Sequence, residues 1–216
     1  MSALLIKALL AYLLGSVIGS LVIGRLRGVD IRTMGSGNPG ATNALRTQGM
    51  KVGITVLLID MFKGWFATAV LAAWPLSFGQ PPDFALAAWA GPVCGIAVIL
   101  GHLYPVWFGF RGGKGVATFV GAVAGLSAAL LLVFVLTWLA AVILLGFVGF
   151  ASILGALAVA IAGAVGDFPA RTPLLAFAVV TTALIVYSHR ANLSRMKAGT
   201  EPRAKKLWLL GARRSG

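Results

Sequence analysis

The sequence has 216 residues, of which 59% are hydrophobic and only 11% are charged, against about 25% in a typical soluble domain. Its 18 Lys and Arg residues outnumber five acids and give a net charge of +13, which suits a nucleic acid, an anionic lipid or an anionic substrate. These values exclude an ordinary soluble domain. Since no segment alternates like a membrane β-barrel, we expect an all-α, polytopic integral membrane protein.

Side chains for disulfide or metal chemistry are scarce. Cys94 is the single cysteine, and it lies inside an apolar segment. The two histidines and five carboxylates are scattered singly along the chain, which argues against a metal cage built by the protein. We therefore expect neither a metal nor a cofactor.

Hydropathy predicts membrane spans at residues 3–24, 52–73, 84–103 and 172–188, and a long apolar run at 115–166 that must be divided. At about 1.5 Å per residue, this run supplies either two long crossings or three short ones. Length alone leaves both divisions open. The distribution of basic residues decides between them, because cytoplasmic loops accumulate Lys and Arg.

The loop after the first span is basic, which puts it in the cytoplasm and the N-terminus outside; it carries Arg25, Arg27, Arg32, Arg46 and Lys51. The tail from His189 onward carries eight more basic residues. It falls inside only if the run at 115–166 crosses three times, with breaks near 125–127 and 146–152. We therefore predict seven transmembrane helices, N-out and C-in. They form one domain over 1–216, with a basic cytoplasmic tail at about 203–216.

The first polar segment, Gly35-Ser-Gly-Asn-Pro-Gly-Ala-Thr-Asn43, predicts a short helix with Asn38 as N-cap, Pro39 at its first position and an end near Gly49. A glycine-rich turn that enters a helix N-terminus is a typical anion site. An ordinary capped loop helix is the alternative interpretation. The candidate residues for anion binding are Ser36, Gly37, Asn38, Asn43 and Arg46.

The second polar segment runs from Gly101 to Thr118 and contains Arg-Gly-Gly-Lys-Gly at 111–115. Backbone N–H groups before a membrane helix, together with two cations, can converge on one phosphate. A P-loop is excluded, because Gly115 follows Lys114 where Ser or Thr is required and no strand precedes the loop. A basic anchor at a helix end is the alternative. The candidates for phosphate binding are His102, Arg111, Gly112, Gly113, Lys114, Gly115 and Thr118.

The third polar segment, His189-Arg-Ala-Asn192-Leu-Ser-Arg195, extends the last span, and Gly199 with Pro202 ends it. On a continuing helix His189, Asn192 and Arg195 share one stripe, where they can orient and neutralise a phosphorylated substrate. The alternative is a set of cations that only flank a membrane helix.

Two charged residues, Asp60 and Lys63, lie one helical turn apart inside the second span. Charges at that depth are costly and by default mark a functional site. We expect Asp60 to have a structural role in an ion pair. Lys63 is the member of the pair that would meet an anionic substrate.

Together, Gly35–Asn43, Gly109–Thr118 and His189–Arg195 with Gly199-Thr-Glu201 closely resemble the bacterial acyl-phosphate:glycerol-3-phosphate acyltransferases, the PlsY family. The resemblance covers the chain in order and spacing from the first span to about Arg203; Met196-Lys-Ala198 is a slight departure. It implies a seven-helix acyltransferase of the bacterial inner membrane with its active site on the cytoplasmic side. The implied reaction of phospholipid synthesis acylates the 1-hydroxyl of sn-glycerol 3-phosphate from acyl phosphate, giving 1-acylglycerol 3-phosphate (lysophosphatidate) and phosphate.

The resemblance also implies roles for residues. Ser36, Arg46, His189 and Asn192 would be catalytic, Glu201 would be structural, and the glycerol-phosphate loop would comprise Gly112, Gly113, Lys114 and Gly115. We expect direct attack without an acyl-enzyme. His189 would orient and stabilise charge, with general base as the rival role. The implied partners are the two substrates, membrane lipid and an upstream enzyme that forms acyl phosphate, and no nucleic acid.

Acyl-CoA-dependent glycerolphosphate acyltransferases carry Asp five residues after His. Here Trp107 and Ser194 occupy those places, which fits a different acyl donor. A transporter for a phosphorylated metabolite is the main rival hypothesis, but the predicted exterior loops offer few polar residues for an outward-facing site. A scaffold that works through its basic tail leaves Ser36, Asn43 and His189 without a role.

Overall fold

The computed structural model describes residues 1–76, 84–168, 170–204 and 207–208, apart from the side chain of Ala85. Every regular element in these ranges is helical, as predicted. The chain divides into two compact units, residues 1–127 and 128–216, and each is described by itself. The expectation of one domain over 1–216 stays a prediction.

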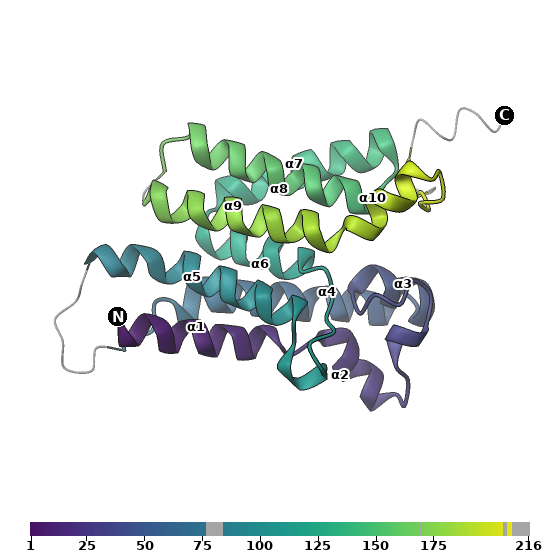
Figure 1. Cartoon of the computed structure of the whole chain (residues 1–216), viewed down its shortest axis with the longest axis horizontal. Coiled ribbons are helices and arrows are strands. Elements are labelled where there is room, and N and C mark those ends of the chain that lie inside the picture. The colour runs from purple at the N-terminus through teal and green to yellow at the C-terminus, as the bar shows by residue number, and fades with distance from the viewer. Residues whose placement is uncertain (77–83, 169, 205–206, 209–216) are drawn as a thin grey trace. The chain divides into compact units, whose positions relative to one another are not determined.

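The first unit carries two of the polar segments between its helices (Figure 1). Its helices are α1 (Ser2–Gly15), α2 (Gly19–Leu26), η1 (Ile31–Thr33), α3 (Ala41–Gln48), α4 (Met50–Trp65), the π-helical η2 (Phe66–Leu71), α5 (Phe84–Leu103), η3 (Val106–Phe108) and α6 (Val116–Leu126). Helix α1 packs along α5, and α4 packs along α6. Between α4 and α6 a side chain on Gly64 would overlap the carbonyl of Thr118, so the two backbones approach closely.

The second unit consists of α7 (Ala128–Leu145), α8 (Val148–Val165), α9 (Arg171–Ser188) and α10 (Arg190–Lys197). Helix α8 packs against both α7 and α9. The chain after α10 is attached to the turn between α7 and α8. There the Arg203 guanidinium lies 3.9 Å from the Trp208 ring centroid, and the Trp208 indole donates to Leu144 O at 3.2 Å.

Among the residues that the structure describes, five helical stretches are long and apolar enough to cross a membrane, and these are Met50–Leu71, Leu86–Phe108, Ala128–Leu145, Val148–Val165 and Arg171–Ser188. The bent pair α1 and α2 counts as a sixth if it forms one span, and α6 is shorter, with 11 residues. The predicted breaks in 115–166 are confirmed, because α6 ends before Ser127 and α7 ends before Gly146.

The first span differs from the prediction of one continuous helix at 3–24. Helix α1 ends at Gly15, α2 begins at Gly19, and the two are bent by 44°. A break inside an apolar segment leaves backbone polar groups without helical partners, and these must be satisfied by other parts of the protein. The groups that satisfy them belong to the site described next.

Candidate active site

Asn43 holds the first polar segment in place. Its side chain is buried; Oδ1 accepts the Ser36 N–H at 3.0 Å, and Nδ2 donates to Met34 O at 2.9 Å and to Ile31 O at 3.3 Å. A side chain on Gly35 would overlap the Asn43 amide. The amide of Asn43 is thus engaged by the loop backbone, whereas the sequence led us to expect contact with phosphate.

The backbone N–H groups of this segment that remain open lie at the N-terminus of α3. The predicted cap at Asn38 is wrong, because the N-cap residue is Gly40. The Gly40 N–H donates to Asn38 O at 2.9 Å, and this turn makes the helix begin at Ala41. No side chain caps α3, and the side chains of Ser36 and Arg46 are exposed without hydrogen-bond partners among the described residues. Uncapped N–H groups, a hydroxyl and a guanidinium remain available to an anion. The Gly37 N–H, by contrast, is engaged by Met34 O at 2.9 Å.

The first and second polar segments are linked by residues that we had used only to assign membrane orientation. Arg32 donates to Phe108 O at 3.4 Å, and Arg25 lies 4.5 Å from the centroid of the Phe108 ring. Asp30 accepts hydrogen bonds from the side chain and the backbone N–H of Arg32, and both lower the pKa of its carboxyl. Phe108 completes an apolar cluster that includes Ile31 and Ala44.

The second segment departs from the expected phosphate cradle. The N–H groups of Gly112 and Gly113 donate to Leu103 O and His102 O, each at 3.1 Å, so these two amides are already engaged. A side chain on Gly112 would overlap His102 O, which explains the glycine. The open backbone groups instead belong to the start of α6, where Gly115 is the N-cap and no side chain caps the helix. Arg111 is exposed beside this end.

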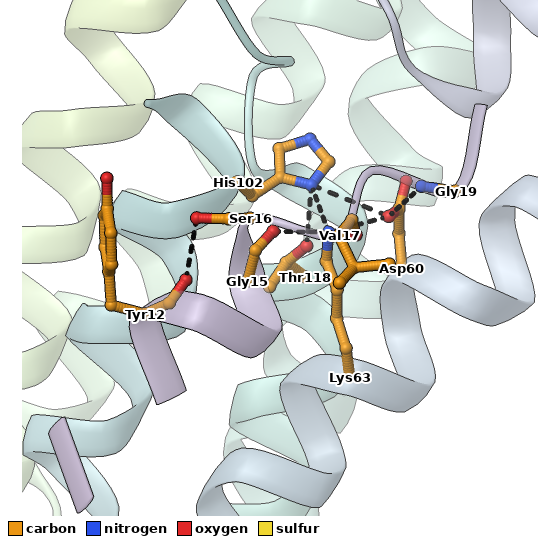
Figure 2. Close-up of polar contacts among 9 residues, drawn as sticks. All are labelled: Tyr12, Gly15, Ser16, Val17, Gly19, Asp60, Lys63, His102 and Thr118. Atoms are coloured by element: carbon orange, nitrogen blue, oxygen red, sulfur yellow. Dashed lines mark hydrogen bonds and ion pairs between the residues drawn. The ribbon is translucent and has the colours of Figure 1, made fainter. Parts of the chain in front are cut away.

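Lys63 fills the break in the first span (Figure 2). Its Nζ atom lies 3.0 Å from Gly15 O, 2.8 Å from Val17 O and 2.9 Å from Asp60 Oδ1. His102 Nδ1 also lies 2.9 Å from Nζ, so four neighbours share the three N–H groups of the ammonium. Lys63 is 3% exposed, so in this structure it serves the broken helix and leaves no N–H for a substrate.

Asp60 completes the same arrangement from the other side of the break. Its Oδ1 atom lies 3.4 Å from the N–H of Gly19, the first residue of α2. The cation therefore faces the C-terminal end of α1 and the anion faces the N-terminal end of α2, which complements both helix dipoles. These contacts are those of the structural ion pair expected for Asp60.

In the second unit, His189 is fixed at the end of α9. The ring is 3% exposed, and Nδ1 lies 2.8 Å from Ile185 O. A carbonyl only accepts, so Nδ1 carries a proton, and in the neutral ring the lone pair is on Nε2. Such a nitrogen can accept a proton or, once protonated, stabilise negative charge.

Glu201 orients the other polar side chains of this segment. It accepts from Asn192 Nδ2 at 2.6 Å and from Arg195 Nε at 2.7 Å. Gly199, with φ of +70°, reverses the chain after α10 and brings Glu201 back to them. Sequence reasoning missed Gly149 on α8, where a Cβ atom would lie 2.9 Å from Asn192 Nδ2 and 3.1 Å from His189 Cδ2.

The structure thus groups the predicted residues in two sets. In the first unit, the loop before α3 lies near His102 and the glycine loop. A Cβ atom on Gly113 would contact both His102 Nε2 and Pro39 O. The second unit gathers His189, Asn192 and Glu201. Within the described ranges, no three His, Cys, Asp or Glu side chains come together as metal ligands.

Comparison with known proteins gives a consistent result. Residues 5–199 match the family model "Glycerol-3-phosphate acyltransferase". The chain is 40% identical over 199 residues to the glycerol-3-phosphate acyltransferase of Aquifex aeolicus (strain VF5), covering 92% of this chain and 98% of that one. It is 41% identical over 202 residues to that of Brucella suis (strain ATCC 23445 / NCTC 10510), covering 93% of each.

Two solved structures are also similar, both of PlsY (YgiH), an integral membrane glycerol 3-phosphate acyltransferase. The glycerol 3-phosphate form has a TM-score of 0.83 at 39% identity, covering 94% of this chain and 96% of that one. The lysophosphatidic acid form has a TM-score of 0.83 at 38% identity, covering 97% and 99%. This chain therefore belongs to the glycerol-3-phosphate acyltransferase family of integral membrane enzymes.

Proposed function

We propose that this enzyme transfers a fatty acyl group from acyl phosphate to the 1-hydroxyl of sn-glycerol 3-phosphate, giving 1-acylglycerol 3-phosphate and phosphate. The observation that carries this proposal is the near full-length likeness to PlsY in its glycerol 3-phosphate and lysophosphatidic acid forms, an acceptor and a product of this reaction. The uncapped N-termini of α3 and α6, with cations on the same segments, support two phosphorylated substrates.

The chemistry needs no covalent enzyme intermediate. The 1-hydroxyl oxygen attacks the acyl carbonyl carbon and forms the new C–O bond. The bond from that carbon to the phosphate oxygen breaks, and phosphate leaves with the electron pair. The hydroxyl proton goes to a substrate phosphate, because the departing phosphate is both a good leaving group and a base.

Each set of polar residues has a role in this scheme. Ser36, Arg46 and the N-terminus of α3 bind the phosphate that leaves, and Arg111, Lys114 and the N-terminus of α6 bind glycerol 3-phosphate. His189, Asn192 and Arg195 serve the same transfer by orienting the substrates and stabilising charge on the carbonyl oxygen. General base catalysis by His189 is the rival role, and the lone pair on Nε2 is compatible with it.

The membrane arrangement is part of the proposal. We propose seven spans, in which the bent pair α1 and α2 and the shorter α6 each cross the bilayer, with the N-terminus outside. The site then lies on the cytoplasmic side of the bacterial inner membrane. An upstream enzyme that forms acyl phosphate must supply the donor. The basic residues at the cytoplasmic ends of the spans support this orientation.

The test uses the full chain purified in detergent or lipid mesophase. Phosphate release is followed with palmitoyl phosphate and glycerol 3-phosphate together, with each alone, and with palmitoyl-CoA as donor. We expect release and lysophosphatidate by mass spectrometry only when both proposed substrates are present. Equal product from palmitoyl-CoA, or no product from palmitoyl phosphate, would refute the proposed donor.

A further inference from the structure

Glu201 lies on a stretch of chain without regular structure. Its side chain is 6% exposed, and it accepts from Asn192 Nδ2 at 2.6 Å and from Arg195 Nε at 2.7 Å. Residues 200–204 belong to no helix, so no helical hydrogen bonds fix the Glu201 backbone. A carboxylate orients its partners only if its own position is fixed. The attachments of the chain on either side of Glu201 therefore decide how well it orients Asn192 and Arg195.

On the N-terminal side, the attachment ends at Thr200. Gly199 has a φ of +70°, and the Thr200 N–H donates to Arg195 O at 2.8 Å, which closes the end of α10. The Thr200 hydroxyl lies 3.3 Å from the same carbonyl oxygen. These bonds reverse the chain, but a segment that is attached at one end only can still open locally.

On the C-terminal side, the chain is attached to the turn between α7 and α8. The Ala204 N–H donates to Gly146 O at 2.8 Å. The Arg203 guanidinium contacts two aromatic rings, at 4.7 Å from the Phe147 centroid and 3.9 Å from the Trp208 centroid. A Cβ atom on Gly146 would lie 2.9 Å from the Trp208 ring, so the ring packs directly on this backbone. We refer to Arg203, Ala204 and Trp208 together as the clasp.

The turn that holds the clasp leads into a helix that touches the same polar side chains. The first turn of α8 carries Gly149, and a Cβ atom there would lie 2.9 Å from Asn192 Nδ2. The backbone of α8 thus lies against the amide of Asn192, and Glu201 accepts a hydrogen bond from the same amide. The clasp fixes these two neighbours of Asn192 to each other.

We infer that Arg203 and Trp208 are positioning residues, because the clasp holds Glu201 where it orients Asn192 and Arg195. This inference rests on the proposed function, in which Asn192 and Arg195 orient the substrates and stabilise charge on the carbonyl oxygen. It extends the set of residues that serve the reaction beyond residue 199, where the family match ends. A clasp that contributed only stability would leave the rate of acyl transfer unchanged in the folded protein.

The kinetic test measures kcat and KM of the full chain with palmitoyl phosphate and glycerol 3-phosphate, per folded enzyme and well below the Tm of every variant. Trp208→Ala should lower kcat roughly 5- to 20-fold with KM nearly unchanged, because charge on the carbonyl oxygen develops only in the transition state. Trp208→Phe keeps a ring beside Arg203 and should recover part of the loss. Leu207→Ala changes the exposed neighbour and should keep wild-type kcat. A wild-type kcat in Trp208→Ala would overturn the inference.

A double-mutant cycle tests whether the clasp acts through Glu201. In a Glu201→Ala background, Trp208→Ala should lower kcat by less than about twofold further, because the group that the clasp positions is already absent. Losses that multiply would refute the inference, since Trp208 would then affect the reaction by another route.

A measurement without substrate keeps the inference testable even if Glu201→Ala does not fold. Glu201 is the only glutamate in the sequence, so ¹³C-glutamate labelling gives one glutamate carboxyl signal, which Glu201→Gln assigns. We expect this signal to move toward that of a free carboxylate in Trp208→Ala and to stay in place in Leu207→Ala. A signal that does not move in Trp208→Ala would contradict the inference. If wild type transferred no acyl group from palmitoyl phosphate to glycerol 3-phosphate, the proposed function would fail, whereas the carboxyl signal would still report on the clasp.

Discussion

At the scale of single residues, buried amides and glycines determine the shape of the site more than its exposed cations do. Asn43 joins three backbone groups of the 31–36 loop to α3, and Glu201 joins Asn192 to Arg195. A buried polar group that loses its partner costs about 1–3 kcal/mol. In the proposed function, these residues affect catalysis through the groups they orient.

Asn43→Ala removes one acceptor and two donated hydrogen bonds from the loop that carries Ser36. For a loss of about 2 kcal/mol we expect Tm to fall by about 4–8 °C, with kcat/KM for glycerol 3-phosphate reduced roughly 10- to 100-fold. Leu45→Ala, an exposed change on the same helix, is the control. Wild-type Tm and kcat/KM in Asn43→Ala would show that the loop does not depend on this amide.

Gly149→Ala places a methyl group 2.9 Å from Asn192 Nδ2 and 3.1 Å from His189 Cδ2. We expect kcat to fall at least about tenfold, because small displacements of the two proposed catalytic groups, His189 and Asn192, are costly. Tm should change little, since Ala favours a helix over Gly by about 1 kcal/mol. Gly163→Ala on the same helix meets no atom within 4 Å and should keep wild-type kcat. Equal kcat values in the two variants would contradict the account.

At the scale of elements, contacts at helix ends stabilise the fold within each unit. In the first unit, Lys63 and Asp60 reach the break between α1 and α2 from α4. In the second, the Arg203 guanidinium lies 4.7 Å from the Phe147 ring centroid in the turn after α7, and the Trp208 indole donates to Leu144 O near the end of α7. The second attachment lies beyond residues 5–199, where the family model matches. It is therefore a feature of this chain that the family match does not describe.

Trp208→Ala should weaken this attachment, because it removes the ring beside Arg203 and the hydrogen bond to Leu144 O. Each interaction contributes about 0.5–1.5 kcal/mol, about 1–3 kcal/mol together, so we expect Tm to fall by about 2–12 °C. Leu207→Ala changes the exposed neighbour and should have a smaller effect. A scan of Tm in detergent checks this, and equal shifts for both variants would rule out a specific role for the Trp208 side chain.

The helix boundaries show what could be predicted from sequence. Breaks near Ser127 and Gly146 were predictable because small residues interrupt apolar runs there and the distribution of basic residues favours three crossings. The break after Gly15 was not, because it lies in an apolar run and its partner Lys63 is 48 residues away. The start of α3 was placed too early because Asn38 and Pro39 form a turn with Gly40 before the helix.

The same limit applies within the site. Motif spacing identified the three polar segments, but it could not tell which N–H groups were already paired. Gly112 and Gly113 looked open, yet they donate to the carbonyls at the end of α5, and the position of that end depends on the fold. In the sequence, Arg25 and Arg32 indicated only the orientation of the membrane spans. Their contacts with Phe108 could not be predicted, because they join segments 76 or more residues apart.

At the scale of the whole molecule, the proposed orientation follows from the basic residues at one set of helix ends. It can be checked with single cysteines in a Cys94→Ala background, because Cys94 is buried. An impermeant maleimide applied to intact cells should label Ser2→Cys. It should label Lys197→Cys only after permeabilisation. Labelling of both from outside would contradict seven crossings.

The central claim is direct acyl transfer between two phosphorylated substrates, and a single-turnover measurement of phosphate release tests it most directly. Enzyme in excess is mixed with palmitoyl phosphate, first without and then with glycerol 3-phosphate. The account predicts no phosphate before the acceptor is added, then one phosphate and one lysophosphatidate per donor consumed. A burst of phosphate without acceptor, with the acyl group on the protein, would contradict it.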